Sequence, residues 1–70
     1  MKLSARNQFK GKIINIEDGA VNGIVTIETP GGDALVATIS MDSIKSLGLE
    51  VGKEAIAVVK ATSVMVGVDD

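Results

Sequence analysis

The sequence predicts an all-β domain of about five short strands with one short helix. Two observations carry this prediction. Aliphatic residues fill nearly all of the 46% apolar share of the 70-residue chain, and they recur in short runs with the alternation and β-branching typical of strands. Glycine, aspartate, asparagine or proline separates these runs at the places where turns are expected. The pattern is that of one small domain, residues 1–70, built mainly from strands.

The first two strands are expected to form a hairpin. Alternating polar and apolar residues predict a strand over residues 7–17, and Asp18-Gly19 after it is a hairpin signal. β-Branched residues predict a second strand from Ala20 to Thr29. Gly23 lies inside this run, directly after Asn22, so a bulge or a close backbone approach is expected there.

A stronger turn follows the second strand. Thr29-Pro30-Gly31-Gly32-Asp33 combines a proline, which presets the first corner, with glycines that accept positive φ. A short third strand is then expected from Ala34 to Ile39. These segments together predict a three-stranded meander over residues 7–39.

A single short helix is expected over residues 41–47. Ser40 is a good N-cap, and Ile44 and Leu47 fall on one face of a helix that begins there. Gly48 is placed to end it as the residue after the C-cap. The helix has about two turns and connects the third strand to the rest of the chain.

The last part of the chain is expected to return to strands. Leu49–Lys53 reads as a turn, and strands are expected at Glu54–Lys60 and Val64–Val68, with a break near Thr62-Ser63. Five strands with a short helix between the third and fourth have the element order of a small OB-like Greek-key barrel.

Size and composition favour a protein that associates with copies of itself. A 70-residue chain buries only about 60% of the surface of its unfolded form. Such small domains are usually stabilised by disulfides, metals or partner subunits, and this chain has no Cys and no His. Because it is also strongly aliphatic, we expect apolar surface that other copies cover.

Charge and hydropathy favour a soluble cytoplasmic protein. The net charge of −2 and the single aromatic residue, Phe9, argue against a nucleic-acid-binding face. Charged residues interrupt the N-terminal segment, so no secretory signal is expected, and no apolar run approaches the roughly 20 residues of a membrane span.

The polar residues suit the binding of a small oxyanion. Ser40 and Ser43 bracket the first turn of the predicted helix, where hydroxyls and backbone amides can donate hydrogen bonds. Arg6 and Lys60 could neutralise a dianion from the flanks. Each residue also has an ordinary reading, since Ser40 is a cap, Ser43 a solvated helix residue, and Arg6 and Lys60 surface charges. Without His, Cys or a nucleophile beside a base, neither enzyme chemistry nor direct protein–metal ligation is expected.

Three segments carry a resemblance to a known family. The opening Ser4-Ala5-Arg6-Asn7, followed by a strand that contains Gly11, resembles that of molbindins. So does Leu47-Gly48-Leu49-Glu50-Val51-Gly52-Lys53 leading into Ala57-Val58-Val59-Lys60-Ala61-Thr62-Ser63-Val64. Molbindins are small molybdate-binding proteins, also described as molybdenum-pterin-binding proteins, whose Mop or TOBE-like module is similar to one found in molybdate-responsive regulators and transporter ATPases. The resemblance covers essentially the whole chain.

The resemblance implies an OB-like barrel that assembles as a hexamer, a trimer of dimers, and binds molybdate at subunit interfaces. Tungstate should also fit. The family's charged ligands, its helix-start hydroxyls and its backbone donors correspond in this chain to Arg6, Lys60, Ser40, Ser43, Ser4 and Ala61.

The function expected from residues and resemblance together is intracellular molybdenum storage or homeostasis by a protein that is not an enzyme. Two alternatives remain open: an OB-fold nucleic-acid-binding module and a ligand-free oligomerisation domain. A pterin cofactor is not expected to be the ligand, because stacking aromatic residues are missing.

Overall fold

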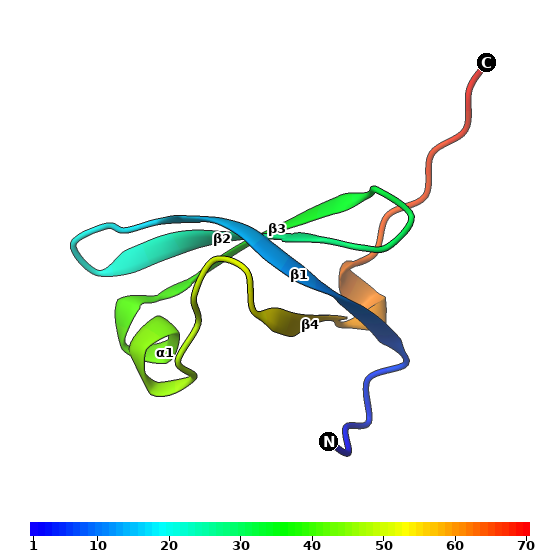
Figure 1. The fold of residues 1–70 in the computed structure, drawn as a ribbon. Coiled ribbons are helices and arrows are strands. Elements are labelled where there is room, and N and C mark those ends of the chain that lie inside the picture. The colour runs from blue at the N-terminus through cyan, green and yellow to red at the C-terminus, as the bar shows by residue number, and fades with distance from the viewer.

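The computed structural model describes residues 1–70 and contains one antiparallel sheet of four strands (Figure 1). The strand order is β3-β2-β1-β4. The elements in chain order are β1 (Asn7–Glu17), β2 (Asn22–Glu28), β3 (Ala34–Ser40), α1 (Met41–Ser46), β4 (Glu54–Val59) and the 3₁₀ turn η1 (Ala61–Ser63). The predicted all-β class with one short helix is confirmed, and the meander over residues 7–39 corresponds to β1, β2 and β3.

β1 is the strand that organises the sheet. Its first half pairs with β4, from Asn7↔Val59 to Lys12↔Glu54, and its second half pairs with β2. The register shifts between Ile13 and Asn15, and such a bulge bends a strand and increases its twist. The sheet therefore curls into a half-barrel in which β3 and β4 are both free edges (Figure 1).

Gly23 is a site of close approach between β2 and α1. A β carbon at this position would lie 2.6 Å from Ile44 Cδ1 and 2.9 Å from Met41 Sδ. Of the two expectations for Gly23, the close approach is confirmed, whereas the bulge lies in β1. The missing side chain lets the helix pack directly onto the sheet.

The helix begins as the sequence predicts and ends one residue earlier. Ser40 caps it, because its Oγ accepts a hydrogen bond of 3.1 Å from the backbone N–H of Ser43. Gly48, with φ of 64°, turns the chain after the last residue. Of the two residues expected on one face of the helix, Ile44 is buried, whereas Leu47 is the C-cap and stays 68% exposed.

The core is very small. Only Ile13, Val25, Ile27 and Ile44 are buried hydrophobic residues. The chain exposes 5540 Å² of surface, whereas a compact monomer of 7.2 kDa exposes about 4,100 Å². Its radius of gyration of 13.0 Å also exceeds the roughly 11 Å expected for a compact 70-residue domain. A single chain is thus an incomplete globule.

The fifth strand expected at Val64–Val68 is absent from the sheet. These residues have no regular secondary structure and are all exposed. A strand needs a partner edge, and η1 turns the chain at the end of β4 so that the segment leaves the body of the molecule (Figure 1). The half-barrel consequently stays open between β3 and β4.

No helix in the structure has the length and apolar character needed to cross a membrane.

Candidate functional site

Ser40 and Ser43 form a hydroxyl pair at the start of α1. Ser40 Oγ donates a hydrogen bond of 2.8 Å to Ser43 Oγ, and both side chains are half-buried. The proton of the Ser40 hydroxyl is therefore engaged, while the Ser43 hydroxyl retains a proton that it can donate to a ligand. Capping and ligand binding are compatible here, because the cap uses an acceptor lone pair of Ser40.

Arg6 and Lys60 lie at the end of the sheet where β1 begins and β4 ends. The last pair of that ladder is Asn7↔Val59, so Arg6 and Lys60 are the residues directly beyond the ends of the two neighbouring strands. Both are exposed, and neither forms an ion pair with a carboxylate. The structure thus places together two cations that are 54 residues apart in sequence and have no internal counter-ion.

Short local contacts order the chain on both sides of these cations. Gln8 Nε2 donates a hydrogen bond of 2.7 Å to the carbonyl of Ala5. On the other strand, the Ser63 N–H donates to the carbonyl of Lys60 at 2.8 Å and closes the η1 turn. Ser4 and Ala61, the remaining predicted site residues, are exposed in these two segments.

The predicted residues therefore form two groups at opposite ends of one chain. Ser40 pairs with Asn22 beside the β1–β2 hairpin, whereas Arg6 and Lys60 flank the far end of β1. β1 has 11 residues, which corresponds to about 35 Å of extended strand. A hydrogen bond acts over about 3 Å, so one chain cannot bring both groups to one small anion. In Figure 1, α1 and η1 accordingly lie on different sides of the molecule.

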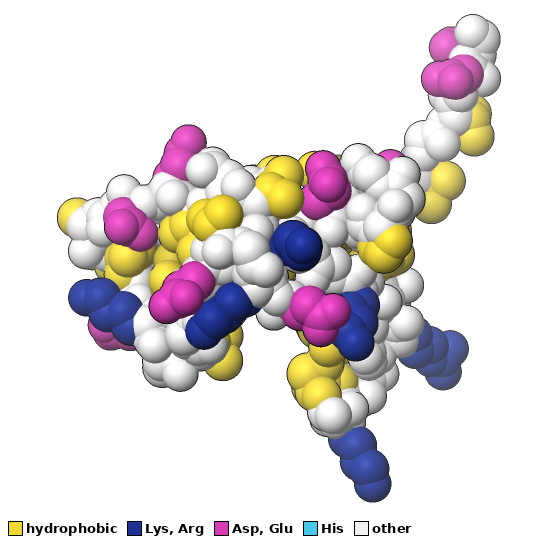
Figure 2. Space-filling view, viewed as in Figure 1, with side chains coloured by type: hydrophobic (Ala, Val, Ile, Leu, Met, Phe, Trp, Pro, Cys, Tyr) yellow, Lys and Arg dark blue, Asp and Glu magenta, His cyan; other side chains and the backbone are white.

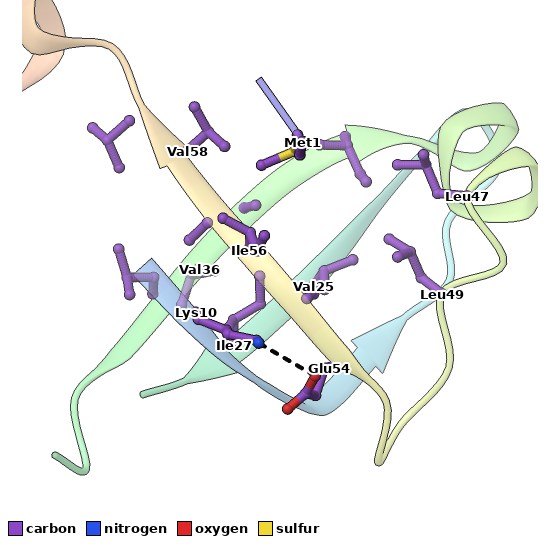
Figure 3. A pocket seen from close by; sticks show the side chains of 16 residues that line it. Met1, Lys10, Val25, Ile27, Val36, Leu47, Leu49, Glu54, Ile56 and Val58 are labelled. Carbon is purple, nitrogen blue, oxygen red and sulfur yellow. Dashed lines mark ion pairs between the residues drawn. The ribbon is translucent and has the colours of Figure 1, made fainter. Parts of the chain in front are cut away.

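An apolar groove of about 650 Å³ occupies the open side of the half-barrel (Figure 3). Its walls are the edge strands β3 and β4, and Val25 and Ile27 form part of its floor. Lys10 and Glu54 lie at its side as an exposed ion pair of 3.9 Å. Sequence reasoning predicted uncovered apolar surface but not its place, since the alternation within each strand does not reveal which strand will be an edge.

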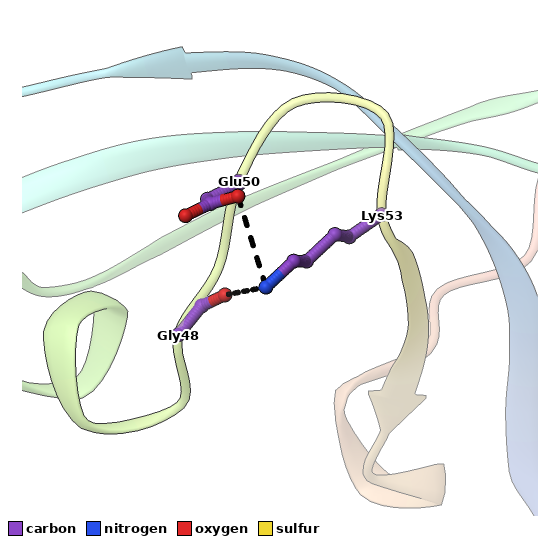
Figure 4. A network of polar contacts seen from close by, with 3 residues as sticks. All are labelled: Gly48, Glu50 and Lys53. Atoms are coloured by element: carbon purple, nitrogen blue, oxygen red, sulfur yellow. Dashed lines mark hydrogen bonds and ion pairs between the residues drawn. The ribbon is translucent and has the colours of Figure 1, made fainter.

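The loop between α1 and β4 is held by its own polar contacts (Figure 4). Lys53 Nζ donates to the carbonyl of Gly48 at 3.4 Å and lies 3.7 Å from Glu50 Oε2. The Gly52 N–H also donates to the carbonyl of Ile13 at 2.8 Å, which ties the loop to β1. The glycine-rich segment that helped to carry the resemblance therefore has a structural role.

No cluster of three or more His, Cys, Asp or Glu side chains that could hold a metal ion is present.

Comparisons with known proteins agree on one family. Residues 3–66 match the family model described as the TOBE domain. A probable molybdenum-pterin-binding protein of Haemophilus influenzae is 61% identical over 69 residues, which cover 99% of this chain and 100% of the relative.

Two solved structures extend this likeness to the fold. MopII from Clostridium pasteurianum superimposes with a TM-score of 0.91 at 43% identity, over 96% of this chain and 100% of that one. The cytoplasmic molybdate-binding protein ModG, with molybdate bound, matches with a TM-score of 0.83 at 41% identity over 87% of this chain and 43% of its own. The chain therefore belongs to the TOBE domain family, and within it to the group of small molybdenum-pterin-binding proteins, the molbindins that the sequence motifs resemble.

Proposed function

We propose that this chain binds molybdate at interfaces between its own copies. The observation that carries the proposal is the separation of the two donor groups. Hydroxyls gather at the start of α1 and unpaired cations gather at the far end of β1, and neither group alone suits a tetrahedral dianion. A second copy can bring its Arg6 and Lys60 to the hydroxyl pair of the first. Relatives with molybdenum or molybdate in their descriptions support this choice of anion.

The proposed site uses Ser4, Arg6, Ser40, Ser43, Lys60 and Ala61. Two cations balance the charge of a dianion, which limits the cost of removing it from water. The Ser43 hydroxyl and backbone N–H groups near Ser4 and Ala61 supply neutral donors to the remaining oxygens. The protein contacts only the oxygens of the anion and does not ligate molybdenum itself. Tungstate, with the same shape and charge, is bound in the same way.

The biological role that fits such a site is storage or homeostasis of molybdenum without catalysis. Binding is reversible, because oxyanion contacts through hydrogen bonds form no covalent bond. The assembly that carries the sites is a hexamer, a trimer of dimers, and it acts in the cytoplasm. The description of ModG as a cytoplasmic molybdate-binding protein supports that location.

Isothermal titration calorimetry on the folded protein tests the proposal. Molybdate and tungstate are expected to bind with affinities in the micromolar range or tighter. Sulfate is the matched control, since it is also a tetrahedral dianion but is smaller. No heat with molybdate at tens of micromolar would refute the proposal and leave a ligand-free assembly domain as the alternative.

A further inference from the structure

We propose that the carboxamide of Asn22 is a further ligand of the oxyanion, donating hydrogen bonds from Nδ2 beside the Ser40–Ser43 hydroxyl pair. This role rests on the proposed function, because it adds a residue to that same site. Asn22 lies outside the set of site residues that the sequence predicted. It follows from the strand register, from the hydrogen bonds of the two serines and from the unused amide of Asn22.

The strand register sets Asn22 beside Ser40. The two residues are direct partners on β2 and β3. The Met41 N–H donates to the carbonyl of Val21 at 2.8 Å, so the preceding pair is a hydrogen-bonded one. The two kinds of pair alternate along an antiparallel ladder, and Asn22 and Ser40 therefore form a non-hydrogen-bonded pair. In such a pair both side chains lie on the same face of the sheet, with Cβ atoms about 5 Å apart.

The packing at Gly23 keeps the first turn of α1 close to this pair. A β carbon on Gly23 would lie 2.9 Å from Met41 Sδ, so the helix begins in direct contact with the start of β2. Ser43 Oγ lies 2.8 Å from Ser40 Oγ. One small anion that contacts the Ser43 hydroxyl is therefore within reach of the Asn22 amide as well.

The Asn22 amide has no partner within its own chain. The residue is exposed, and its side chain forms no hydrogen bond. Asparagine is depleted in strands, yet Asn22 is the first residue of β2 and is followed by a run rich in β-branched residues. A carboxamide carries two N–H donors, so Asn22 offers two unused donors next to the hydroxyl pair.

The hydroxyl pair by itself is short of donors. Ser40 Oγ gives its proton to Ser43 Oγ, which leaves one hydroxyl proton, on Ser43, for a ligand. A tetrahedral dianion presents four oxygens that accept hydrogen bonds. The two N–H bonds of Asn22 raise the number of side-chain donors at this end of the chain from one to three.

The charges at this end favour a neutral ligand residue. Glu17 ends β1, Asp18 follows it in the hairpin, and Asp42 lies in the first turn of α1. Figure 2 shows acidic side chains at the end of the molecule that carries the β1–β2 hairpin and α1. These carboxylates oppose a dianion, and the unpaired cations of the same chain are at its far end. Uncharged donors such as the Asn22 amide are therefore what this end can contribute, while a second copy brings the positive charge.

Calorimetry on the folded protein tests the role of Asn22. Asn22→Ala is expected to weaken molybdate binding roughly 10- to 100-fold, the range for a hydrogen bond to a charged group. Asn22→Asp has the same shape but replaces the donor by a charged acceptor, so it is expected to bind more weakly still. The matched control is Asn15→Ala, because Asn15 is also an exposed strand asparagine without a side-chain hydrogen bond. It is expected to bind as the wild type does.

Nuclear magnetic resonance gives a readout that a merely structural role would not move. The chain has four side-chain carboxamides, those of Asn7, Gln8, Asn15 and Asn22. The Asn22 signal is identified by its absence from the spectrum of Asn22→Ala, and the Asn15 signal in the same way. On saturation with molybdate the Asn22 carboxamide signal is expected to shift, while that of Asn15 stays in place.

The outcomes separate this role from the proposed function. If the wild type binds molybdate but Asn22→Ala binds equally well, or if the Asn22 signal does not move, Asn22 is not a ligand and the proposed site stands without it. Equal losses in the Asn22 and Asn15 variants, or an aspartate variant that binds as tightly as the alanine variant, also contradict the role. If the wild type itself binds no molybdate, both the proposed function and the role of Asn22 are refuted.

Discussion

Arg6 and Lys60 are two exposed cations at the same end of the sheet, and this position makes them candidates for anion binding. Each is an ordinary surface cation by burial, yet each lies directly beyond the last pair of the β1–β4 ladder and has no carboxylate partner. Two like charges at one end of the sheet repel each other where their side chains approach, and an anion between them would relieve this repulsion. A dianion would turn that repulsion into attraction.

Replacement of these cations is expected to weaken anion binding. Arg6→Ala and Lys60→Ala should each lose about 1.5–3 kcal/mol of molybdate affinity, the range of charge-assisted hydrogen bonds. Lys12→Ala is the matched control, since Lys12 is an exposed and unpaired lysine in the middle of β1. Calorimetry compares the three. An equal loss in the Lys12 variant would mean that net charge, and not a defined site, governs binding.

Gly23 makes a prediction about stability. Gly23→Ala puts a methyl group against Ile44 Cδ1 and Met41 Sδ at distances shorter than van der Waals contact, and overpacking of this kind costs about 1–3 kcal/mol. Urea denaturation measures the change. Gly31→Ala serves as control, because its β carbon would meet nothing closer than 3.9 Å and the variant should unfold within about 0.5 kcal/mol of wild type.

At the scale of elements, the first turn of α1 carries the helix cap and also the hydroxyl pair of the proposed site. The cap acceptor is Ser40 Oγ, while the hydroxyl proton that remains for a ligand is on Ser43. Substitution of Ser40 and substitution of Ser43 are therefore expected to have different effects, the first on stability and the second on molybdate binding.

Ser40→Ala removes the cap and is expected to destabilise the protein by about 0.5–2 kcal/mol. Ser43→Ala keeps the N–H that the cap accepts, so it should change stability little while it weakens molybdate binding by about 0.5–1.5 kcal/mol. Thermal denaturation without ligand and calorimetry with ligand give the two values. Loss of stability in both variants to the same degree would show that the pair acts only as a helix cap.

The elements also show what sequence patterns can and cannot reveal. Residues 7–17, the turn at Pro30 and the cap at Ser40 were predicted because each depends on local chemistry, and the structure confirms them. The fate of Val64–Val68 depends on which edge is within reach of η1, and periodicity holds no such information. The serines and cations of the predicted site were chosen by residue type and resemblance. Their division between two ends of the molecule follows from strand register, which a single sequence does not give.

At the scale of the whole molecule, the small core predicts that stability depends on protein concentration. Only four hydrophobic residues are buried within one chain, so an assembly of copies, as proposed, would add much of the apolar burial. The melting temperature is therefore expected to rise with protein concentration, which scanning calorimetry at a series of concentrations measures. A melting temperature that stays constant over a hundredfold dilution would show that the single chain is stable alone.

Bound anion is expected to add to this stability by mass action. At a free molybdate concentration of 100 times the dissociation constant, each site contributes about 2.7 kcal/mol to the folded assembly. The same scan with molybdate, and with sulfate as control, measures the shift. If molybdate does not change the melting temperature, the protein lacks the proposed site.

If the chain stores molybdate at sites between its copies, as proposed, the placement of hydroxyls and cations at opposite ends of each chain also bears on how that store fills in a cell. A site that needs parts of two chains exists only after the chains have met, so the capacity for the anion grows more steeply than the number of chains made. At low expression most chains would remain unassembled and bind no anion. At higher expression the chains would assemble, and many binding sites would form together. The amount of anion held would then follow the rate at which the chain is synthesised.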